Sequence, residues 1–365
     1  MIPLLIPDLP TTEQLIPWLR RIDNNKWYSN FGPLVQEFES KLKQFLSPQQ
    51  PIDLTTVSSG TTALELALLA LNLPVGSQVL LPALTFPATA TAIERAGLQP
   101  IFTDVEPYAW LLTPDIARQV HKKLAYDAVM PVATFGCPQP VTEWDKFSEE
   151  TGIPVLLDAA AAFGSQTIGQ RCVITFSFHA TKPFSIGEGG LVVANSPDFI
   201  QLVKRLSNFG FDNGIIIQSG SNAKLSEYHA AVGLAQLARW QQIVKRRQYL
   251  WHYYRQRLQT MDDHISLQRT PNNHIPAILP IKVSPPDKLA ALIKHLTNQS
   301  IETRRWYCPP LYEHPAFSNI SRLAPNGSEQ LPVTEELGKS LLGLPFHTAL
   351  DEEQIAYVCS SLLKC

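Results

Sequence analysis

The stretch QVLLPALTFPATATAIERAGLQPIFTDV, residues 78–105, decides the fold class of this chain. It begins with an apolar run from Gln78, continues with a helical pattern from Phe86, and returns to an apolar run from Leu98. Near-continuous apolar runs on either side of a helix are typical of neighbouring strands in a sheet that is covered on both faces. The stretch therefore predicts a strand–helix–strand unit of an α/β fold.

The same alternation extends through the first two thirds of the chain. The helical pattern TTALELALLALNL begins at Thr61, and the apolar runs YDAVMPVATFG and IPVLLDAA begin at Tyr126 and Ile153. We expect an α/β protein whose large domain has three layers around a mainly parallel mixed sheet. Because ligands of such sheets bind at the carboxyl ends of the strands, we look for chemistry where these runs end.

A smaller C-terminal α/β domain is expected after a long helical pattern that begins at Leu225. The pattern is about twice the usual helix length, so it predicts a helix that bridges two domains or two subunits. Beyond Met261 the sequence again suggests a strand, HIPAILPIKV, and a helix, DKLAALIKHLTNQ. We therefore expect a large domain over residues 1–250 and a small domain over residues 251–365.

The composition excludes several classes of protein. A net charge of -2 argues against binding to nucleic acid or to an acidic membrane. The one dense basic run, residues 245–247, lies in a long helical pattern, where we expect a solvated helix face. The five cysteines show neither CxxC spacing nor a nearby histidine partner, so we expect free thiols and no metal site. No apolar stretch approaches the ~20 residues that cross a bilayer, and the first residues do not resemble a signal peptide. These features favour a cytoplasmic protein.

The segment SSGTTALELAL, from Ser58, follows an apolar run and opens a helix. Small residues allow backbone N–H groups at a helix N-terminus to approach an anion, and hydroxyl groups add donors, so the segment suits a phosphate group. The same Ser/Thr-Gly pattern also forms ordinary helix caps. By itself, the motif leaves both interpretations open.

Two charged residues stand where a solitary charge would be costly. Asp158 closes the apolar run IPVLLD, so its partner is an arginine, a helix N-terminus or a protonated pyridine nitrogen. Lys182 lies in TFSFHATKPFSIGEGG, a loop between two strand-like runs, among phenylalanines and glycines. Burial lowers the pKa of an amine and makes it nucleophilic enough to bond to an aldehyde. For the neighbouring His179 we expect a hydrogen-bonded supporting role.

Colinear blocks covering most of the chain resemble the nucleotide-sugar aminotransferases, which have the aspartate-aminotransferase fold. In chain order these blocks are WYSNFGPLVQEFE, VSSGTTALELALLAL, LPALTFPATATAI, PVATFG, LLDAAAAFG, SFHATKPFSIGEGG and GSNAKLSEYHAAVGLAQL. The resemblance implies an enzyme that binds pyridoxal 5′-phosphate and moves amino groups. By resemblance, Lys182 bonds to the cofactor and shuttles the proton, Asp158 pairs with the pyridine nitrogen, and Phe86 stacks on the ring.

The resemblance also implies how the phosphate and the substrates are bound. Thr61, Thr62 and Ser177 match phosphate-binding positions of the family. Asn222, in GSNAK, resembles an asparagine that reaches the phosphate of the neighbouring subunit, which implies a homodimer with shared active sites. The expected partners are a nucleotide-linked keto-deoxysugar and an amino-acid donor, usually glutamate. The block SFHATK is more similar to members that act at C4 of the sugar than to those that act at C3.

Some positions depart from the family pattern. Ala161 stands where a His or Gln usually lies beside the cofactor's phenolic oxygen, so that oxygen lacks a donor unless water or another residue supplies one. Ser207 and Tyr312 replace an Arg and a His, and the segment 163–176 is short. Two alternatives stay open: a dehydratase on the same scaffold, against which Lys182 argues because such relatives carry His, and a sensor or regulatory protein with weak or no activity.

Overall fold

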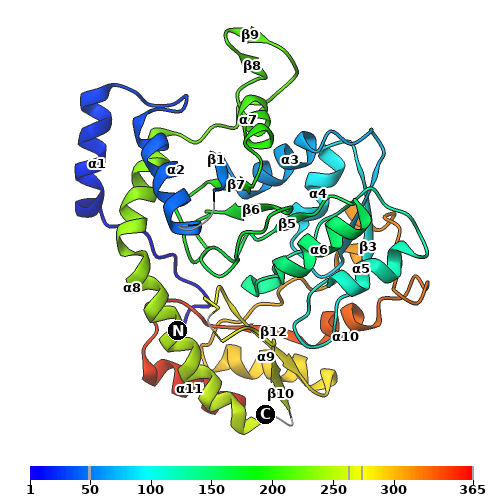
Figure 1. Cartoon of the computed structure of the whole chain (residues 1–365). Coiled ribbons are helices and arrows are strands. Elements are labelled where there is room, and N and C mark those ends of the chain that lie inside the picture. Colours follow the sequence, from blue (N-terminus) through cyan, green and yellow to red (C-terminus); the bar gives the residue numbers. More distant parts are fainter. Residues whose placement is uncertain (48–50, 262–263, 273, 364–365) are drawn as a thin grey trace.

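A central sheet forms the middle of the large domain (Figure 1). The computed structural model describes residues 1–47, 51–261, 264–272 and 274–363. The strands of the sheet are β1 (Asp53–Val57), β2 (Gln78–Pro82), β3 (Gln99–Thr103), β4 (Ala128–Val129), β5 (Leu156–Asp158), β6 (Val173–Ser177) and β7 (Gly190–Ala194). The strand order is β3-β2-β4 and β5-β6-β7-β1, and parallel bridges from the β4 segment to the β5 segment join the two groups. Only β7 runs antiparallel to its neighbours among these described strands, so the predicted mainly parallel mixed sheet is confirmed.

Helices cover both faces of this sheet, which explains why its strands read as continuous apolar runs. Leu156 and Val192 belong to one apolar cluster, whereas their sequence neighbours Leu157 and Val193 belong to the cluster on the opposite face. The helices of the large domain are α1 (Thr12–Asn25), α2 (Pro33–Leu46), α3 (Gly60–Ala70), α4 (Pro87–Arg95), α5 (Pro114–His121), α6 (Val141–Thr151), α7 (Pro197–Leu206) and α8 (Glu227–Leu258). Helices α3, α4 and α7 pack on the first face, and α2, α5, α6 and α8 pack on the second.

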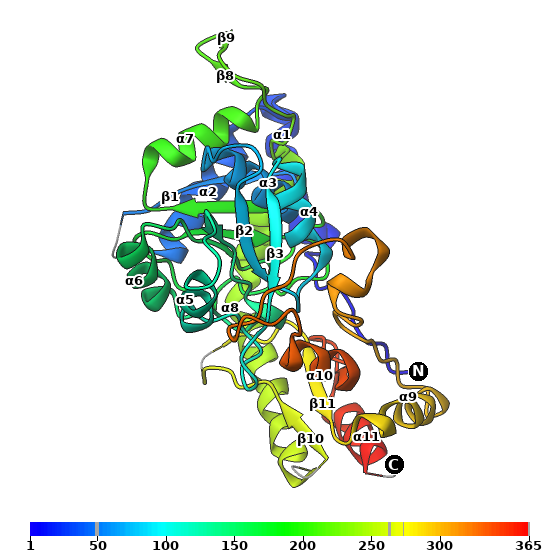
Figure 2. The same ribbon diagram turned by 90° about the vertical axis from the view of Figure 1, so that its right-hand side faces the viewer.

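The small domain is built on an antiparallel sheet with β11 at its centre (Figure 2). Its elements are β10 (Ile265–Leu267), β11 (Leu279–Val283), α9 (Leu289–Asn298), α10 (Pro332–Ser340), β12 (Leu341–Leu344) and α11 (Glu352–Leu362). The end of α8 packs into the apolar cluster of this domain, together with Ile2 from the start of the chain. Helix α8 runs unbroken past residue 250, and the division between residues 250 and 251 stays a prediction.

Short elements complete the described chain. They are the 3₁₀ turns η1 (Thr134–Gly136), η2 (Gln259–Met261), η3 (Pro286–Lys288), η4 (Leu311–Glu313) and η5 (Pro315–Phe317), and the hairpin strands β8 (Phe211–Asp212) and β9 (Ile215–Ile216). The hairpin projects away from the body of the molecule at the top of Figure 1. The run YDAVMPVATFG is a strand only at β4, and η1 ends it with positive φ angles at Phe135 and Gly136.

The described residues can be searched for membrane-spanning helices, metal-binding groups and paired cysteines. Within them, no helix combines the length and apolar character that a membrane span needs. In the same part of the chain, no group of three or more His, Cys, Asp or Glu residues is placed to hold a metal ion. Four cysteines in the described ranges are free thiols, and Cys365 lies outside those ranges.

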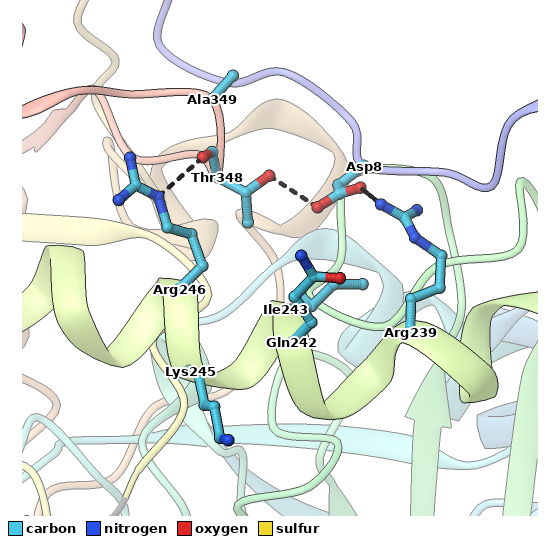
Figure 3. Close-up of a pocket in the computed structure, with 8 residues that line it drawn as sticks. All are labelled: Asp8, Arg239, Gln242, Ile243, Lys245, Arg246, Thr348 and Ala349. Carbon is cyan, nitrogen blue, oxygen red and sulfur yellow. Dashed lines mark hydrogen bonds and ion pairs between the residues drawn. The ribbon is translucent and has the colours of Figure 1, made fainter.

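The N-terminal segment is fastened across α8 beside a cavity of about 640 Å³ (Figure 3). The Asp8 carboxylate pairs with Arg239 of α8 at 2.8 Å and accepts a 2.7 Å hydrogen bond from the Thr348 hydroxyl. Arg246 donates from Nε to the Thr348 carbonyl at 3.3 Å. The charged groups in this cavity therefore hold three segments of the chain together: the first residues, α8 and the loop before α11.

Candidate active site

Asp158 is the most buried charged group at the carboxyl edge of β5 and β6. It ends β5 and is 4% exposed. Thr89 of α4 donates from Oγ1 to one carboxylate oxygen at 2.8 Å, and the Ala160 N–H donates to the other at 3.1 Å. Burial raises the pKa of Asp158, while these hydrogen bonds and the nearby Lys182 charge act in the opposite direction. A buried carboxylate with few donors is a strong partner for a protonated ligand nitrogen.

Lys182 lies in the connection between β6 and β7, as predicted from the sequence. Its backbone N–H donates to the His179 carbonyl at 2.9 Å, which closes a turn. Burial lowers the pKa of the Lys182 amine, and the negative charge of Asp158 opposes that shift. Asp158 and Lys182 are thus close enough for the charge of each to shift the pKa of the other. His179 bonds through Nδ1 to the Thr181 hydroxyl at 2.9 Å, and its supporting role stays a prediction.

The first turn of α3 faces the end of β6. Ser59 caps α3, because its hydroxyl accepts from the Thr62 N–H at 3.1 Å and lies 2.8 Å from the Thr62 hydroxyl. A β-carbon on Gly60 would lie 2.6 Å from the Ser177 Cβ, so only glycine permits this approach. Ser59 therefore caps α3, as one interpretation of SSGTT expected, and the same turn approaches Ser177 through Gly60.

Asn222 stands at the base of the β8–β9 hairpin and is exposed. Its side-chain oxygen accepts from the Lys224 ammonium at 2.8 Å. The carbonyl of the next residue, Ala223, accepts from the Ser58 N–H at 2.8 Å, which places this segment beside the start of α3. That Asn222 serves the site of a neighbouring subunit stays a prediction.

Aromatic rings gather at the start of α4, the helix whose Thr89 binds Asp158. Phe86, the N-cap of α4, is 56% exposed, which is unusual for a phenylalanine and leaves its ring available to a ligand. The Tyr307 ring lies 6.4 Å from it and stacks on Phe135 at 4.7 Å. Sequence reasoning missed Thr89, Phe135 and Tyr307. Thr89 could have been predicted, because it follows Phe86 by three residues in the same helical turn. No sequence pattern pointed to Phe135 or Tyr307.

Ala161 lies near this group without offering a side-chain donor. It is buried, and its carbonyl packs against η1 so closely that a β-carbon on Gly136 would come within 2.9 Å of the carbonyl oxygen. Ser207 and Tyr312, the other departures named above, are also buried. The hydroxyl of Ser207, the C-cap of α7, donates to the Lys204 carbonyl at 2.8 Å, so it has a local structural partner.

The described residues fit pyridoxal 5′-phosphate. A buried carboxylate lies near a lysine whose pKa is lowered, and an exposed phenylalanine caps α4, the helix that binds this carboxylate through Thr89. A glycine-opened helix N-terminus lies at the adjacent strand end. These are the groups that a pyridinium nitrogen, an aldehyde, an aromatic ring and a phosphate respectively require. The fold and the site thus define a pyridoxal-phosphate-dependent transaminase of fold type I.

The comparisons with known proteins agree. The model of the DegT/DnrJ/EryC1/StrS aminotransferase family matches residues 11–363, and the chain belongs to this family. A dTDP-4-amino-4,6-dideoxy-D-glucose transaminase from Shigella dysenteriae is 32% identical over 98% of this chain and 96% of its own length. A crystal structure of a Bacillus cereus protein assigned to the PLP-dependent aminotransferases is 31% identical, has a TM-score of 0.91 and covers 99% of both chains. The structure of DesI with its TDP-sugar product is 28% identical, with a TM-score of 0.87 over 100% of this chain and 93% of DesI.

Proposed function

We propose that this transaminase transfers an amino group from glutamate to a nucleotide-linked 4-keto deoxysugar. One observation carries the proposal: a buried Asp158 and Lys182 lie near each other at the same edge of the sheet, and burial lowers the pKa of Lys182. DesI, solved with a TDP-sugar product, supports a nucleotide sugar as substrate. The Shigella relative, named for a dTDP-linked 4-amino sugar, supports the same class and favours C4 over C3. The composition favours the cytoplasm as its compartment.

Each proposed residue has a defined task. When bound, pyridoxal phosphate supplies a conjugated ring that accepts the electron pair left as a C–H bond beside the amino nitrogen loses its proton. Asp158 would hold a proton on the ring nitrogen by charge. Lys182 would bond to the aldehyde and, once released as a neutral amine, carry a proton between carbon atoms at that position. Its lowered pKa favours the neutral amine.

The remaining residues would fix the cofactor in place. Thr61, Thr62 and Ser177, with the backbone N–H groups at the start of α3, would bind the phosphate, because helix N-termini favour anions. Phe86 would stack on the ring. Together these contacts would hold the aldehyde carbon within reach of Lys182 and keep the ring nitrogen directed at Asp158.

We further propose a homodimer whose active sites are shared between subunits. The β8–β9 hairpin exposes isoleucines at its projecting tip, and Ile215 and Ile216 are 67% and 59% exposed. Exposed apolar side chains on a projecting element are typical of a contact with another chain. Asn222 at the base of this hairpin would then contact the phosphate in the neighbouring subunit.

Spectroscopy of the cofactor-loaded protein tests the proposal. Glutamate should convert the lysine-linked cofactor into its aminated form and shift the visible absorption, and a dTDP-linked 4-keto-6-deoxysugar should then restore the starting spectrum. A sugar with the keto group at C3 should restore it more slowly. The protein with Lys182→Ala serves as the matched control. No spectral change with glutamate in the wild type would contradict the proposed donor, and equal rates with both sugars would contradict the C4 preference.

A further inference from the structure

Tyr307 enters the site from the segment between α9 and α10 and has no role so far. Its ring stacks on Phe135 with planes inclined by 11°, and it lies beside Phe86. Phe135 belongs to η1, which follows the bridge between Val132 and Asp158. Tyr307 therefore packs on a turn that begins two residues after the residue bridged to Asp158.

The two stacked residues, Tyr307 and Phe135, both have an uncommon backbone conformation. Tyr307 has a φ of 57° and Phe135 a φ of 60°, a left-handed region that side-chain-bearing residues seldom adopt. Trp110 packs its ring edge-on against Phe135 at 6.2 Å and supports it from behind. Conformations of this kind gather at ligand-binding sites, where the surrounding structure holds a side chain in one direction.

The Tyr307 hydroxyl is available to a ligand. Among the described residues, none forms a hydrogen bond with it, although the residue is only partly exposed. Burial, and next the negative charge of Asp158, raise the pKa of Tyr307, so the hydroxyl lies within electrostatic reach of that carboxylate. A phenol with a raised pKa stays protonated at neutral pH and can donate a hydrogen bond.

The cofactor requires such a donor. The carbon that carries its aldehyde has a phenolic oxygen as neighbour, and an oxygen that bears negative charge in a buried site is costly unless a donor reaches it. Ala161 cannot donate from its methyl group. Its carbonyl packs on Gly136 of η1, and Tyr307 packs on Phe135 of the same turn.

We infer that the Tyr307 hydroxyl donates a hydrogen bond to the phenolic oxygen of bound pyridoxal phosphate, in place of the donor that Ala161 lacks. The inference rests on the proposed function, because it assumes that Lys182 and Asp158 hold the cofactor. The groups that titrate around this oxygen are Asp158 from β5, Lys182 from the β6–β7 connection and Tyr307 itself. Phe86 from α4 and Phe135 from η1 carry no charge.

This hydrogen bond would tune the nitrogen that joins Lys182 to the cofactor. The negative phenolic oxygen stabilises the protonated form of that nitrogen, and a donor to the oxygen disperses part of the negative charge. The bond from Tyr307 therefore lowers the pH at which the nitrogen loses its proton. Removing the hydroxyl should raise that pH.

A pH titration of the visible spectrum of the loaded protein measures this effect without turnover. Tyr307→Phe keeps the ring stack on Phe135 and removes only the hydroxyl. We expect its spectral midpoint to lie about one pH unit or more above that of the wild type. Adding Ala161→His to Tyr307→Phe should bring the midpoint back toward the wild-type value, since histidine can donate from the other side of η1.

Tyr312→Phe is the matched control. Tyr312 is a second tyrosine of the same segment, but its ring packs on Phe102 at 6.5 Å. Burial, and next the charges of Glu335 and Glu313, raise the pKa of Tyr312, without a contribution from Asp158. Its removal should leave the midpoint unchanged. Equal midpoints in wild type and Tyr307→Phe, or an equal rise with Tyr312→Phe, would overturn the inference. Such a failure is distinct from failure of the Lys182 assignment, which would instead leave a lysine-linked spectrum in the Lys182→Ala protein.

Discussion

Gly60 and Ser177 stand closer together than two residues with ordinary side chains could. A β-carbon built on Gly60 would lie 2.6 Å from the Ser177 Cβ and 3.1 Å from its Cα. The first turn of α3 is therefore pressed directly onto the end of β6. This approach brings the N–H groups of the helix and the Ser177 hydroxyl to one point, where a single phosphate group could contact both.

Gly60→Ala should separate these two elements. The added methyl group forces α3 or β6 to shift, and we expect a loss of stability of about 1–3 kcal/mol, which is usual for overpacking. The affinity for pyridoxal phosphate should fall more than that of a variant damaged elsewhere, because the phosphate donors move apart. Thermal unfolding with and without cofactor measures both effects. An unchanged cofactor affinity would show that the phosphate does not bind at this turn.

Lys182→Ala should abolish the covalent link to the cofactor while leaving the phosphate contacts intact. No other amine described at this strand edge has the same relation to Asp158. Borohydride reduction of the loaded wild-type protein, followed by peptide mapping, should place the label on Lys182. A label on any other lysine would refute the assignment.

The lowered pKa of Lys182 predicts a pH dependence for covalent capture of the cofactor. Only the neutral amine attacks an aldehyde, and burial lowers the pKa of Lys182 below the ordinary lysine value of 10.5. The capture rate in the cofactor-free protein should therefore rise with pH and level off before that value is reached. The rate is followed by visible absorption after mixing. A rate that keeps rising through pH 10.5 would indicate an ordinary exposed lysine.

Asp158→Asn should preserve the fold and reduce turnover by at least about 100-fold, a typical effect of removing a preorganised electrostatic group. An amide cannot hold the proton of the pyridine nitrogen by charge. Asp127→Asn is the control, because its carboxylate accepts from the Gln78 N–H at the start of β2, the end opposite the site. Half-reaction rates with glutamate compare the two variants. A rate near that of the wild type in Asp158→Asn would contradict its assigned role.

A shared site predicts complementation between two inactive proteins. Lys182→Ala and Asn222→Ala chains, once mixed and allowed to exchange, should recover about one quarter of the wild-type activity. Half of the dimers would be mixed, and each mixed dimer would have one site with both native residues. Native mass spectrometry confirms exchange. No recovered activity in an exchanged sample would argue against a site built from two subunits.

The sequence was most informative where a side chain and its position in an element coincide. The apolar run IPVLLD placed Asp158 at a buried strand end, and glycines and phenylalanines around Lys182 indicated a loop in the interior. The antiparallel direction of β7 was not predicted, because a strand buried on both faces reads the same in either direction.

Contacts between segments that are far apart in the chain could not be predicted from the sequence either. Tyr307 is 149 residues from Asp158 by the numbering, and its place in the site depends on how the small domain folds back. The run that contains β4 appeared as one long strand, yet Pro131 follows it closely and the positive φ at Phe135 ends the extended backbone. Both features depend on tertiary packing, which periodicity does not record.

The inclusion of Ile2 in the apolar cluster of the small domain has a consequence for the order of folding. The strands of the central sheet are complete once residue 194 has been made, so the large domain has its sheet early in synthesis. The small domain instead joins Ile2 with Leu362, and the first residues it needs leave the ribosome long before the last. Until α11 has been synthesised, Ile2 lacks part of the apolar cluster that it packs into, so the small domain can complete its core only late in synthesis.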